Sequence, residues 1–159
     1  MKKQKGFSLI ELLIVVAIIL IIAAIAIPNL LRARIAANES SAVASIRTLN
    51  TAQISYNSAY PTVGFSSTMT ALGGTTCTPP DSTSACLIDT QLASGTKSGY
   101  TFALSGVSGT PSASYQFIAN PVVANQTGVR HFCSFADGVV RSNGSTAIST
   151  CDNTVTPLQ

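Results

Sequence analysis

Residues 7–27 read FSLIELLIVVAIILIIAAIAI, and Ser8 and Glu11 are the only members of this run that are not apolar. A helix that rises about 1.5 Å per residue would carry the run across roughly 30 Å, the thickness of the hydrocarbon core of a bilayer. Because the run is apolar on every side, it needs lipid or other copies of itself around it, and the remaining chain is too poor in bulky apolar residues to enclose it. The sequence therefore predicts a membrane-spanning helix near the N-terminus.

Charge gives a first indication of topology. The chain has 159 residues, a formal net charge of +3 and only 9% charged residues. Lys2, Lys3 and Lys5 supply the excess and favour a cytoplasmic N-terminus, although Arg32 and Arg34 beyond the apolar run weaken this bias. Past residue 6 the chain is formally neutral and has no face rich in Lys or Arg, so no direct nucleic-acid site is expected.

The helical pattern continues beyond Pro28 but becomes amphipathic. Apolar side chains recur at spacings of three, four or seven residues, at Leu31, Ile35, Ala42, Ile46, Leu49 and Tyr56. Polar side chains are expected on other faces, namely Arg32, Asn38, Glu39, Arg47 and Asn50. We expect one helix over residues 7–58 that is ended by Tyr60-Pro61, with a bend or loosened turn near Ala24 caused by Pro28.

The composition changes after residue 60. Ten of the 11 glycines and six of the 7 prolines lie there, among many Ser and Thr. Short β-rich runs occur at residues 100–104, 115–119, 129–134 and 139–142, and Asp137-Gly138 provides a hairpin turn between the last two. These runs predict an antiparallel sheet. Residues 61–99 read as a long surface connection with a short helix near residues 87–93.

A specific motif surrounds the start of the apolar run. The stretch Lys5-Gly6-Phe7-Ser8-Leu9-Ile10-Glu11-Leu12-Leu13-Ile14-Val15-Val16 strongly resembles the leader and cleavage site of type IV prepilins and type II secretion pseudopilins. The resemblance is close from residue 3 to about residue 36 and fades beyond. It implies cleavage between Gly6 and Phe7 by a prepilin peptidase on the cytoplasmic side, N-methylation of Phe7, and packing of many copies into a filament.

The resemblance also implies an α+β architecture, the type IV pilin fold. In this arrangement a long N-terminal helix packs on a small antiparallel sheet with a C-terminal disulfide loop. Its segments are a leader at 1–6, a transmembrane or filament-core helix at 7–27, an amphipathic helix half at 28–60, an αβ-loop at 61–99, and the sheet with its disulfide region at 100–159. Leu20 departs from the family, in which many pilins have Gly near this position, so any melted stretch of helix is expected to be short and to lie just before Pro28.

Glu11 is the informative polar residue of the apolar run. A carboxylate at the bilayer centre costs roughly 2.5 to 3.5 kcal/mol on insertion scales, and less near the surface. Cleavage after Gly6 would create a cationic partner, the α-amine of Phe7, one turn away in the same chain or in a neighbour. The resemblance implies the neighbour's amine, which would make Glu11, Phe7 and Pro28 the assembly residues. The alternative is a carboxylate that lies at the lipid–water interface.

The cysteines suggest an oxidising compartment. Cys77, Cys86, Cys133 and Cys151 all lie in the part of the chain that the predicted topology places outside the cell. Three pairings are possible. Sequential pairing, 77 with 86 and 133 with 151, is preferred because each bridge closes a short loop, and the second bridge would resemble the C-terminal disulfide loop of type IV pilins. No C-x-x-C pair occurs, so neither a metal site nor covalent haem is expected, and no cofactor is predicted.

Other candidate sites are weak. His131 is the only histidine and is expected to face solvent or a neighbouring subunit, because no nucleophile motif accompanies it and an enzyme is not expected. Asp137, Asp152 and Asn153 could supply oxygen ligands to Ca²⁺, as happens near the C-terminus of some major pseudopilins.

The favoured function is a pilin, the structural subunit of a type IV pilus that serves adhesion, motility or DNA uptake. Its expected partners are identical subunits, the prepilin peptidase and the inner-membrane assembly platform. Before assembly it would lie in the inner membrane with its N-terminus cytoplasmic and its head outside, and afterwards in a cell-surface pilus. The alternatives are a type II secretion major pseudopilin and a non-polymerising, membrane-anchored or secreted binding module. Cleavage of a secretory signal after Ala26 would establish the last of these.

Overall fold

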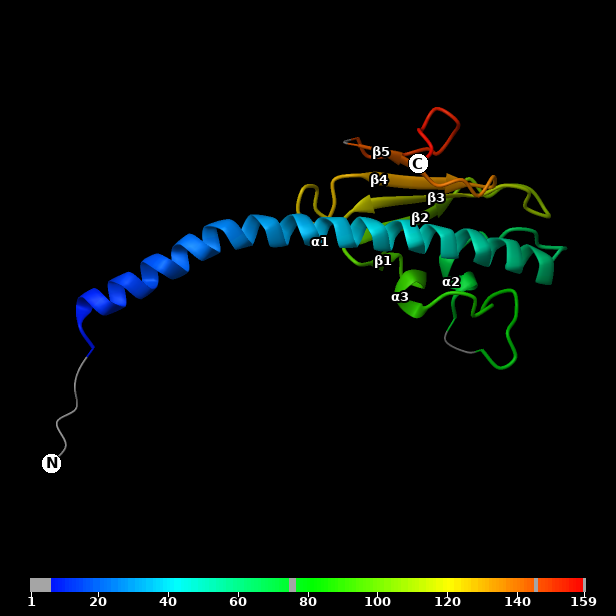
Figure 1. Ribbon diagram of the computed structural model, residues 1–159. Helices are drawn as coiled ribbons and strands as arrows, with labels where there is room; N and C mark the ends of the chain where they lie inside the picture. Colours follow the sequence, from blue (N-terminus) through cyan, green and yellow to red (C-terminus); the bar gives the residue numbers. More distant parts are fainter. Residues whose placement is uncertain (1–6, 75–76, 145, 159) are drawn as a thin grey trace. The chain divides into compact units, whose positions relative to one another are not determined.

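The computed structural model describes residues 7–74, 77–144 and 146–158, so Gly6 and the leader lysines lie outside the described residues. The elements are α1 (Leu9–Ala59), α2 (Met69–Leu72), α3 (Thr90–Ala93), β1 (Thr96–Lys97), β2 (Tyr100–Ser105), β3 (Gln116–Pro121), β4 (His131–Phe135) and β5 (Arg141–Asn143) (Figure 1). The chain forms two compact units that divide within α1, between Arg34 and Ile35. We call the described residues 7–34 the N-terminal unit and 35–158 the head.

Helix α1 closely matches its predicted range. It ends at Ala59, directly before Tyr60-Pro61, and the N–H of Tyr60 still donates to the carbonyl oxygen of Tyr56 at 2.9 Å. Proline disfavours the helical conformation in the residue before it, which explains this end. The helix is continuous through Ala24 and Pro28, so the loosened turn expected there is not seen.

Five strands form one antiparallel sheet in the order β1-β2-β3-β4-β5. The four predicted strands are present with ends shifted by one or two residues, while β1 was missed because its two polar residues, Thr96 and Lys97, carry no alternating pattern. The predicted turn joins β4 to β5: Gly138 has a φ of +74°, a conformation that glycine adopts without strain, and its N–H donates to Phe135 O at 2.8 Å. The antiparallel α+β architecture is therefore confirmed.

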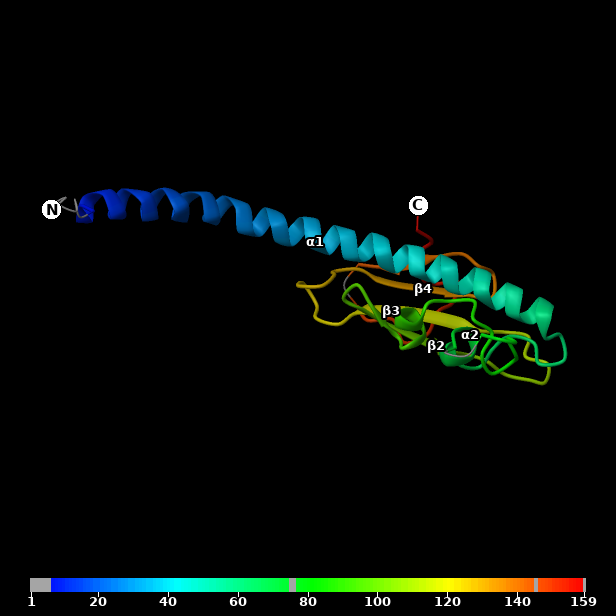
Figure 2. The same ribbon diagram turned by 90° about the horizontal axis from the view of Figure 1, so that it is seen from below.

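The core of the head lies between the second half of α1 and the sheet. Figure 2 shows this part of α1 running along the sheet as a separate layer. Four of the six predicted apolar positions of α1 are buried, and they are Ala42, Ile46, Leu49 and Tyr56. They pack in one cluster with large side chains of the sheet, including Tyr100, Phe117 and Phe132. Leu31 is exposed and Ile35 is only partly buried, so the stripe begins later than its periodicity predicted.

Two polar residues of α1 were placed on the wrong face. Glu39 and Asn50 are only 6% and 5% exposed, and both point into the head. The amide of Asn50 donates to the Ser134 hydroxyl at 2.9 Å and accepts from the Tyr115 hydroxyl at 3.4 Å. Polar groups are buried without large cost when they are hydrogen-bonded. Because these partners lie far away in the sequence, the helical pattern alone could not reveal them.

The connection between α1 and β1 is tied to the helix by Gln53. This fully buried amide donates to Ser66 O at 3.0 Å and accepts from Ser66 N–H at 2.8 Å. The short helix expected near residues 87–93 is α3, whose N-cap residue Asp89 accepts from Leu92 N–H at 2.8 Å. Helix α2 was not predicted, since four residues are too few to give a periodic signal.

Candidate assembly helix and the disulfide-closed end of the head

The predicted cleavage point lies just before the first turn of α1. Gly6 is outside the described residues, and Phe7, the first described residue, is 85% exposed. Helix α1 begins two residues later, at Leu9, with Ser8 in the N-cap position.

The Glu11 carboxylate closes the first turn of the helix. Its Oε2 accepts a hydrogen bond from the backbone N–H of Ser8 at 2.9 Å. A glutamate that reaches back three residues in this way forms half of a capping box, and a negative charge in the first turn also complements the helix dipole. This role was not predicted from the sequence, although the Ser8-x-x-Glu11 spacing is its known signal.

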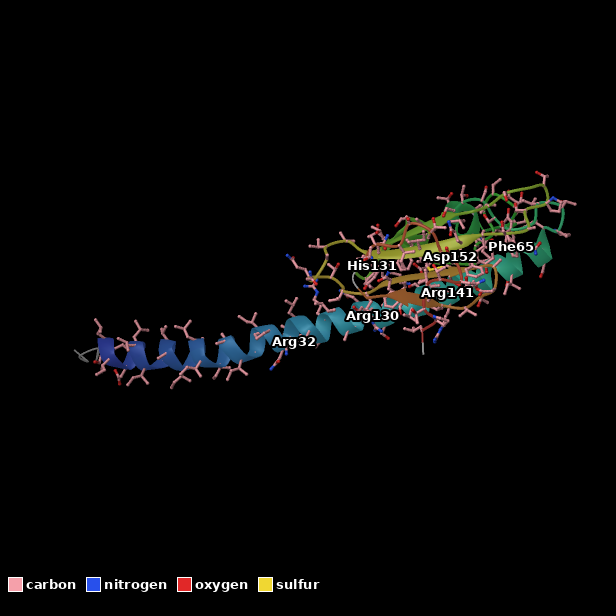
Figure 3. All side chains as sticks on the ribbon, turned by 90° about the horizontal axis from the view of Figure 1, so that it is seen from above. Arg32, Phe65, Arg130, His131, Arg141 and Asp152 are labelled. Carbon is pink, nitrogen blue, oxygen red and sulfur yellow. A yellow bond between two sulfur atoms is a disulfide. The ribbon has the colours of Figure 1, made fainter. Side chains whose placement is uncertain are left out.

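The N-terminal unit exposes apolar side chains all round. Figure 3 shows side chains projecting from every side of this part of α1, and its large apolar residues from Phe7 to Leu31 are all exposed. The described residues include one helix that is long and apolar enough to cross a membrane, and its most apolar 18-residue window has a mean hydropathy of 3.3 and no buried residue. Pro28 lies in this unit. Such a surface is unfavourable in water and needs an apolar environment.

Two disulfides join the four cysteines. Cys77 is bonded to Cys86 and Cys133 to Cys151, each with Cα atoms 5.8 Å apart. The first closes the loop ahead of α3, and the second ties β4 to the C-terminal segment, as expected for the C-terminal disulfide loop. Cys133 and Cys151 pack with Ile118 and Ile148 in a small apolar cluster of their own. The second bridge thus supplies both a covalent link and core contacts.

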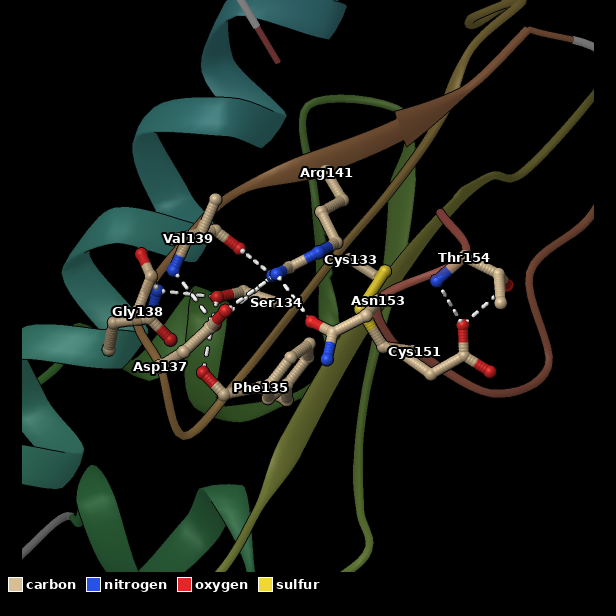
Figure 4. A network of polar contacts seen from close by, with 12 residues as sticks. Cys133, Ser134, Phe135, Asp137, Gly138, Val139, Arg141, Cys151, Asn153 and Thr154 are labelled. Carbon is tan, nitrogen blue, oxygen red and sulfur yellow. Dashed lines mark hydrogen bonds and ion pairs between the residues drawn. A yellow bond between two sulfur atoms is a disulfide. The ribbon is translucent and has the colours of Figure 1, made fainter. Parts of the chain in front are cut away.

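A buried arginine holds the C-terminal segment against the sheet (Figure 4). Arg141 is 5% exposed, and its Nη2 donates to Asp137 Oδ2 at 2.6 Å and to Asn153 Oδ1 at 3.2 Å. Its Nη1 donates to Asp137 Oδ1 at 3.1 Å and to Val139 O at 3.0 Å, and the guanidinium lies 4.3 Å from the centre of the Phe135 ring. Burial raises the pKa of the Asp137 carboxyl, but hydrogen bonds and the charge of Arg141 outweigh it and hold the pKa below its usual value.

This network includes two of the three residues considered as weak candidate ligands for Ca²⁺. Asp137 and Asn153 do come together, but around a guanidinium, so a cation already lies between their oxygens. Asp152 belongs to a different contact and accepts from the N–H of Thr154 at 2.8 Å. Within the described ranges, no three His, Cys, Asp or Glu side chains are grouped closely enough to hold a metal ion. The Arg141 contact was missed because Asp137 and Arg141 meet only after the hairpin forms.

His131 does not face solvent, contrary to expectation. It is 8% exposed, and its Nδ1 lies 2.8 Å from Oδ1 of Asn120 on β3. Burial lowers the pKa of the His131 imidazole because it disfavours the charged form. The ring on β4 is hydrogen-bonded to an amide on β3 and so adds a side-chain contact between these two strands.

Glu39 joins α1 to the segment that precedes β4. Its Oε1 accepts from the N–H groups of Val129 and Arg130, each at 3.0 Å, and its Oε2 accepts from Arg130 Nε at 2.8 Å. Burial raises the pKa of the Glu39 carboxyl, but these hydrogen bonds and the charge of Arg130 together lower it by more. The pKa of Glu39 therefore lies below its usual value. The carboxylate is thus ionised at neutral pH and fixes the end of the sheet to the helix.

Comparison with known proteins places the strongest similarity at the N-terminus. Residues 1–27 match a family model described as the prokaryotic N-terminal methylation motif. The type IV wide pilus major component PilA4 of Thermus thermophilus is 65% identical over 40 residues, which cover 25% of this chain and 30% of that protein. The type IV major pilin protein PilA of Myxococcus xanthus is 50% identical over 54 residues, covering 34% of this chain and 24% of that protein.

A secretion protein is also similar. The type II secretion system core protein G of Vibrio cholerae is 43% identical over 65 residues, which cover 39% of this chain and 44% of that protein. The chain thus matches less than half the length of each of these three relatives. No solved structure matches the chain. The methylation motif and these relatives support the resemblance to type IV pilins and pseudopilins, and the long helix with an antiparallel sheet is consistent with their fold.

Proposed function

We propose that the protein is a structural subunit of a type IV pilus. The observation that carries this proposal is the exposure of apolar side chains on all sides of the N-terminal unit. Most of these residues lie within the region that matches the methylation motif. Lipid covers this surface while the subunit waits in the membrane, and the same unit of other copies covers it in the filament. The subunit therefore moves from membrane to fibre without exposing the surface to water.

Processing prepares the helix for this exchange. A prepilin peptidase cleaves between Gly6 and Phe7 at the cytoplasmic membrane surface, and Phe7 is then N-methylated. The new amine keeps its positive charge and pairs with Glu11 of a neighbouring copy, while Glu11 also caps its own helix through Ser8. An inner-membrane assembly platform passes the subunits into the fibre. No bond-making step occurs within the subunit itself, so the proposed role is not enzymatic.

The head forms the outside of the fibre. It lies beyond the membrane from the cytoplasmic N-terminus, where oxidation of its four cysteines to two disulfides is favoured. Buried polar contacts of Glu39 and Arg141 add to these bonds and stabilise a domain with many loops. The fibre would then serve adhesion, motility or DNA uptake.

The second candidate is a major pseudopilin of a type II secretion system. The similarity to the secretion core protein of Vibrio cholerae favours it. Two observations favour the pilus: the two relatives with the highest identities are named as pilus components, and the residues considered for Ca²⁺ instead surround or neighbour Arg141. Deletion of the gene in its host separates the two functions, because loss of long surface fibres indicates the pilus and loss of protein secretion with fibres intact indicates the pseudopilin.

A further inference from the structure

Three ion pairs join charged side chains within the head. They are Lys97–Asp89, Arg130–Glu39 and Arg141–Asp137. Among the described residues of the head, the charged side chains outside these pairs are Arg47, Asp81 and Asp152. Within the described part of the head, one cation and two anions therefore remain for contacts beyond the subunit, in addition to Arg32 and Arg34 of the N-terminal unit.

Arg47 stands on the exposed side of α1, between two grooves. One groove has a volume of about 320 Å³ and is lined by Arg47, Thr48, Thr51, Ala52, Ser55 and Leu87. The other, about 370 Å³, brings Arg47 together with the ion pair of Glu39 and Arg130 and with the apolar side chains of Val43 and Leu158. The first groove is rich in hydroxyls and has a single charge, so it fits a small polar segment that carries one carboxylate.

Asp81 presents such a segment. It lies in the loop closed by the Cys77–Cys86 disulfide, and its Oδ1 accepts from the hydroxyl and N–H of Thr83, both at 2.7 Å, and from Ser84 N–H at 2.9 Å. These hydrogen bonds lower the pKa of Asp81, and the bond from the Thr83 hydroxyl has the largest effect. The exposed carboxyl is therefore ionised at neutral pH. The loop therefore holds a negative charge in a fixed orientation at the surface.

Within the described part of the head, Arg47 and Asp81 form no ion pair with each other. The hydroxyl of buried Tyr56 donates to Ser82 O at 2.6 Å, which places the Asp81 loop on the buried side of α1. Tyr56 follows Arg47 by nine residues, or about two and a half helical turns, so the two side chains leave α1 on opposite faces. Arg47 therefore leaves α1 away from Tyr56, although Leu87, which follows the Asp81 loop, lines the groove beside Arg47. Both charged side chains are exposed and open to contact with another molecule.

We propose that Arg47 of one copy pairs with Asp81 of the next copy, whose loop docks in the groove beside Arg47. The inference rests on the proposed filament and names one of its contacts. Because the two surfaces are different, the contact is head-to-tail. A head-to-tail contact leaves one surface free on each end of a dimer, so further copies can add. It generates an open helical polymer when the rotation between successive copies does not close a ring.

Asp152 is the less suitable anion. It accepts hydrogen bonds from Thr154, and the positive charge of Arg141 also helps to lower its pKa. Part of its charge is thus balanced within its own head, whereas no cation contributes to the lowered pKa of Asp81. This difference makes Asp152 the matched control in a charge-exchange experiment.

The test measures fibres sheared from cells that carry the complete assembly machinery. Arg47→Glu and Asp81→Arg are each expected to reduce fibre yield by about five-fold or more, since each places like charges in every contact along the fibre. The double variant is expected to recover to within about two-fold of the unaltered protein. Asp152→Arg is expected to leave the yield nearly unchanged and not to rescue Arg47→Glu. Membrane levels of each precursor and its intact disulfides show that the variants fold.

A second measurement uses a variant that keeps the charge. Fibres of Arg47→Lys, assembled from a mixture of isotopically labelled and unlabelled copies, are treated with a carbodiimide and analysed as peptides. The expected product is an amide link between position 47 of one copy and Asp81 of another. Normal fibres from both single variants, rescue by Asp152→Arg, or links from position 47 only to other carboxylates would overturn the pairing. Absence of fibres from the unaltered protein would remove the proposed function and, with it, this inference.

Discussion

Glu39 shows how much one buried side chain can do in this head. Three hydrogen bonds reach its carboxylate, two from backbone N–H groups and one from the Arg130 side chain. Hydrogen bonds to the charged form favour it, and here they outweigh the effect of burial, so the pKa is below its usual value. Glu39 therefore links protonation to the attachment of α1 to the sheet.

We predict that this link appears as a pH dependence of stability. The pKa of Glu39 is lower in the folded than in the unfolded head, so its stabilisation is complete above the unfolded value of about 4.3 and is lost as pH falls through the folded value. At pH 7, Glu39→Gln is expected to reduce the free energy of unfolding by about 1 to 3 kcal/mol. The difference from the unaltered head should shrink towards pH 3.

Thermal unfolding followed by circular dichroism at a series of pH values checks this. Asp81→Asn is the comparison, because it removes an exposed carboxyl and keeps a side-chain oxygen that can accept from Thr83. The pKa of Asp81 is also lowered, but by hydrogen bonds within its own loop, so a smaller change with pH is expected than for Glu39→Gln. A difference between Glu39→Gln and the unaltered head that stays constant from pH 7 to pH 3 would show that the charge of Glu39 has no such role.

Arg141 leads to a prediction about metal dependence. Its guanidinium bridges Asp137 and Asn153, where the sequence had suggested Ca²⁺ ligands. Arg141→Met leaves the Asp137 carboxylate without its cation, and we expect it to lower the stability of the head by about 2 kcal/mol or more. Melting temperatures measured with a chelator and with added Ca²⁺ are expected to coincide for the unaltered head. A rise in the melting temperature of the unaltered head with Ca²⁺ would contradict the view that the Arg141 guanidinium takes the place of a metal ion between Asp137 and Asn153.

At the scale of elements, α1 joins two tasks in one helix. The residues from Phe7 to Leu31 expose apolar side chains for lipid or neighbours, while Ala42, Ile46, Leu49 and Tyr56 build the core of the head. The start of the helix is fixed by the contact between Ser8 and Glu11. Glu11 consequently has two roles that can be separated. Its side-chain oxygen accepts a hydrogen bond that caps its own helix, and its negative charge is proposed to pair with the amine of a neighbouring copy.

The variant Glu11→Gln separates these properties. Glutamine also reaches back to the N-cap N–H, so the helix start is retained and only the charge is lost. We predict normal membrane insertion but no fibres, whereas a role limited to capping would leave assembly intact. Membrane fractionation and electron microscopy of sheared fibres check both outcomes. Abundant fibres from Glu11→Gln would refute the charge pairing, and Glu11→Ala, which removes both properties, is the reference.

At the scale of the whole molecule, local patterns predicted what depends on local sequence. The apolar run, the end of α1 at Tyr60-Pro61 and the turn at Asp137-Gly138 follow from residues that are close together in the chain. The burial of polar residues whose partners are distant in the sequence was not predicted. Glu39, Asn50 and His131 are buried because their partners are brought to them by the fold.

The same distinction applies to the candidate site. The prepilin-type motif is contiguous, so Gly6, Phe7 and Glu11 could be selected from the sequence, although Gly6 lies outside the described residues. Arg141 could not be selected, since its role depends on the hairpin and on the C-terminal segment that the Cys133–Cys151 bond holds in place. The charges of Arg47 and Asp81 likewise become informative only after the ion pairs of the head are known.

The central claim is that a processed apolar helix leaves the membrane to become the core of a fibre made of many copies. Mass analysis of the N-terminal peptide from the main component of sheared surface fibres tests it most directly. We expect this protein to be that component, with a chain that begins at N-methylated Phe7. Fibres that lack the protein, or a mature chain that begins after Ala26, would contradict it.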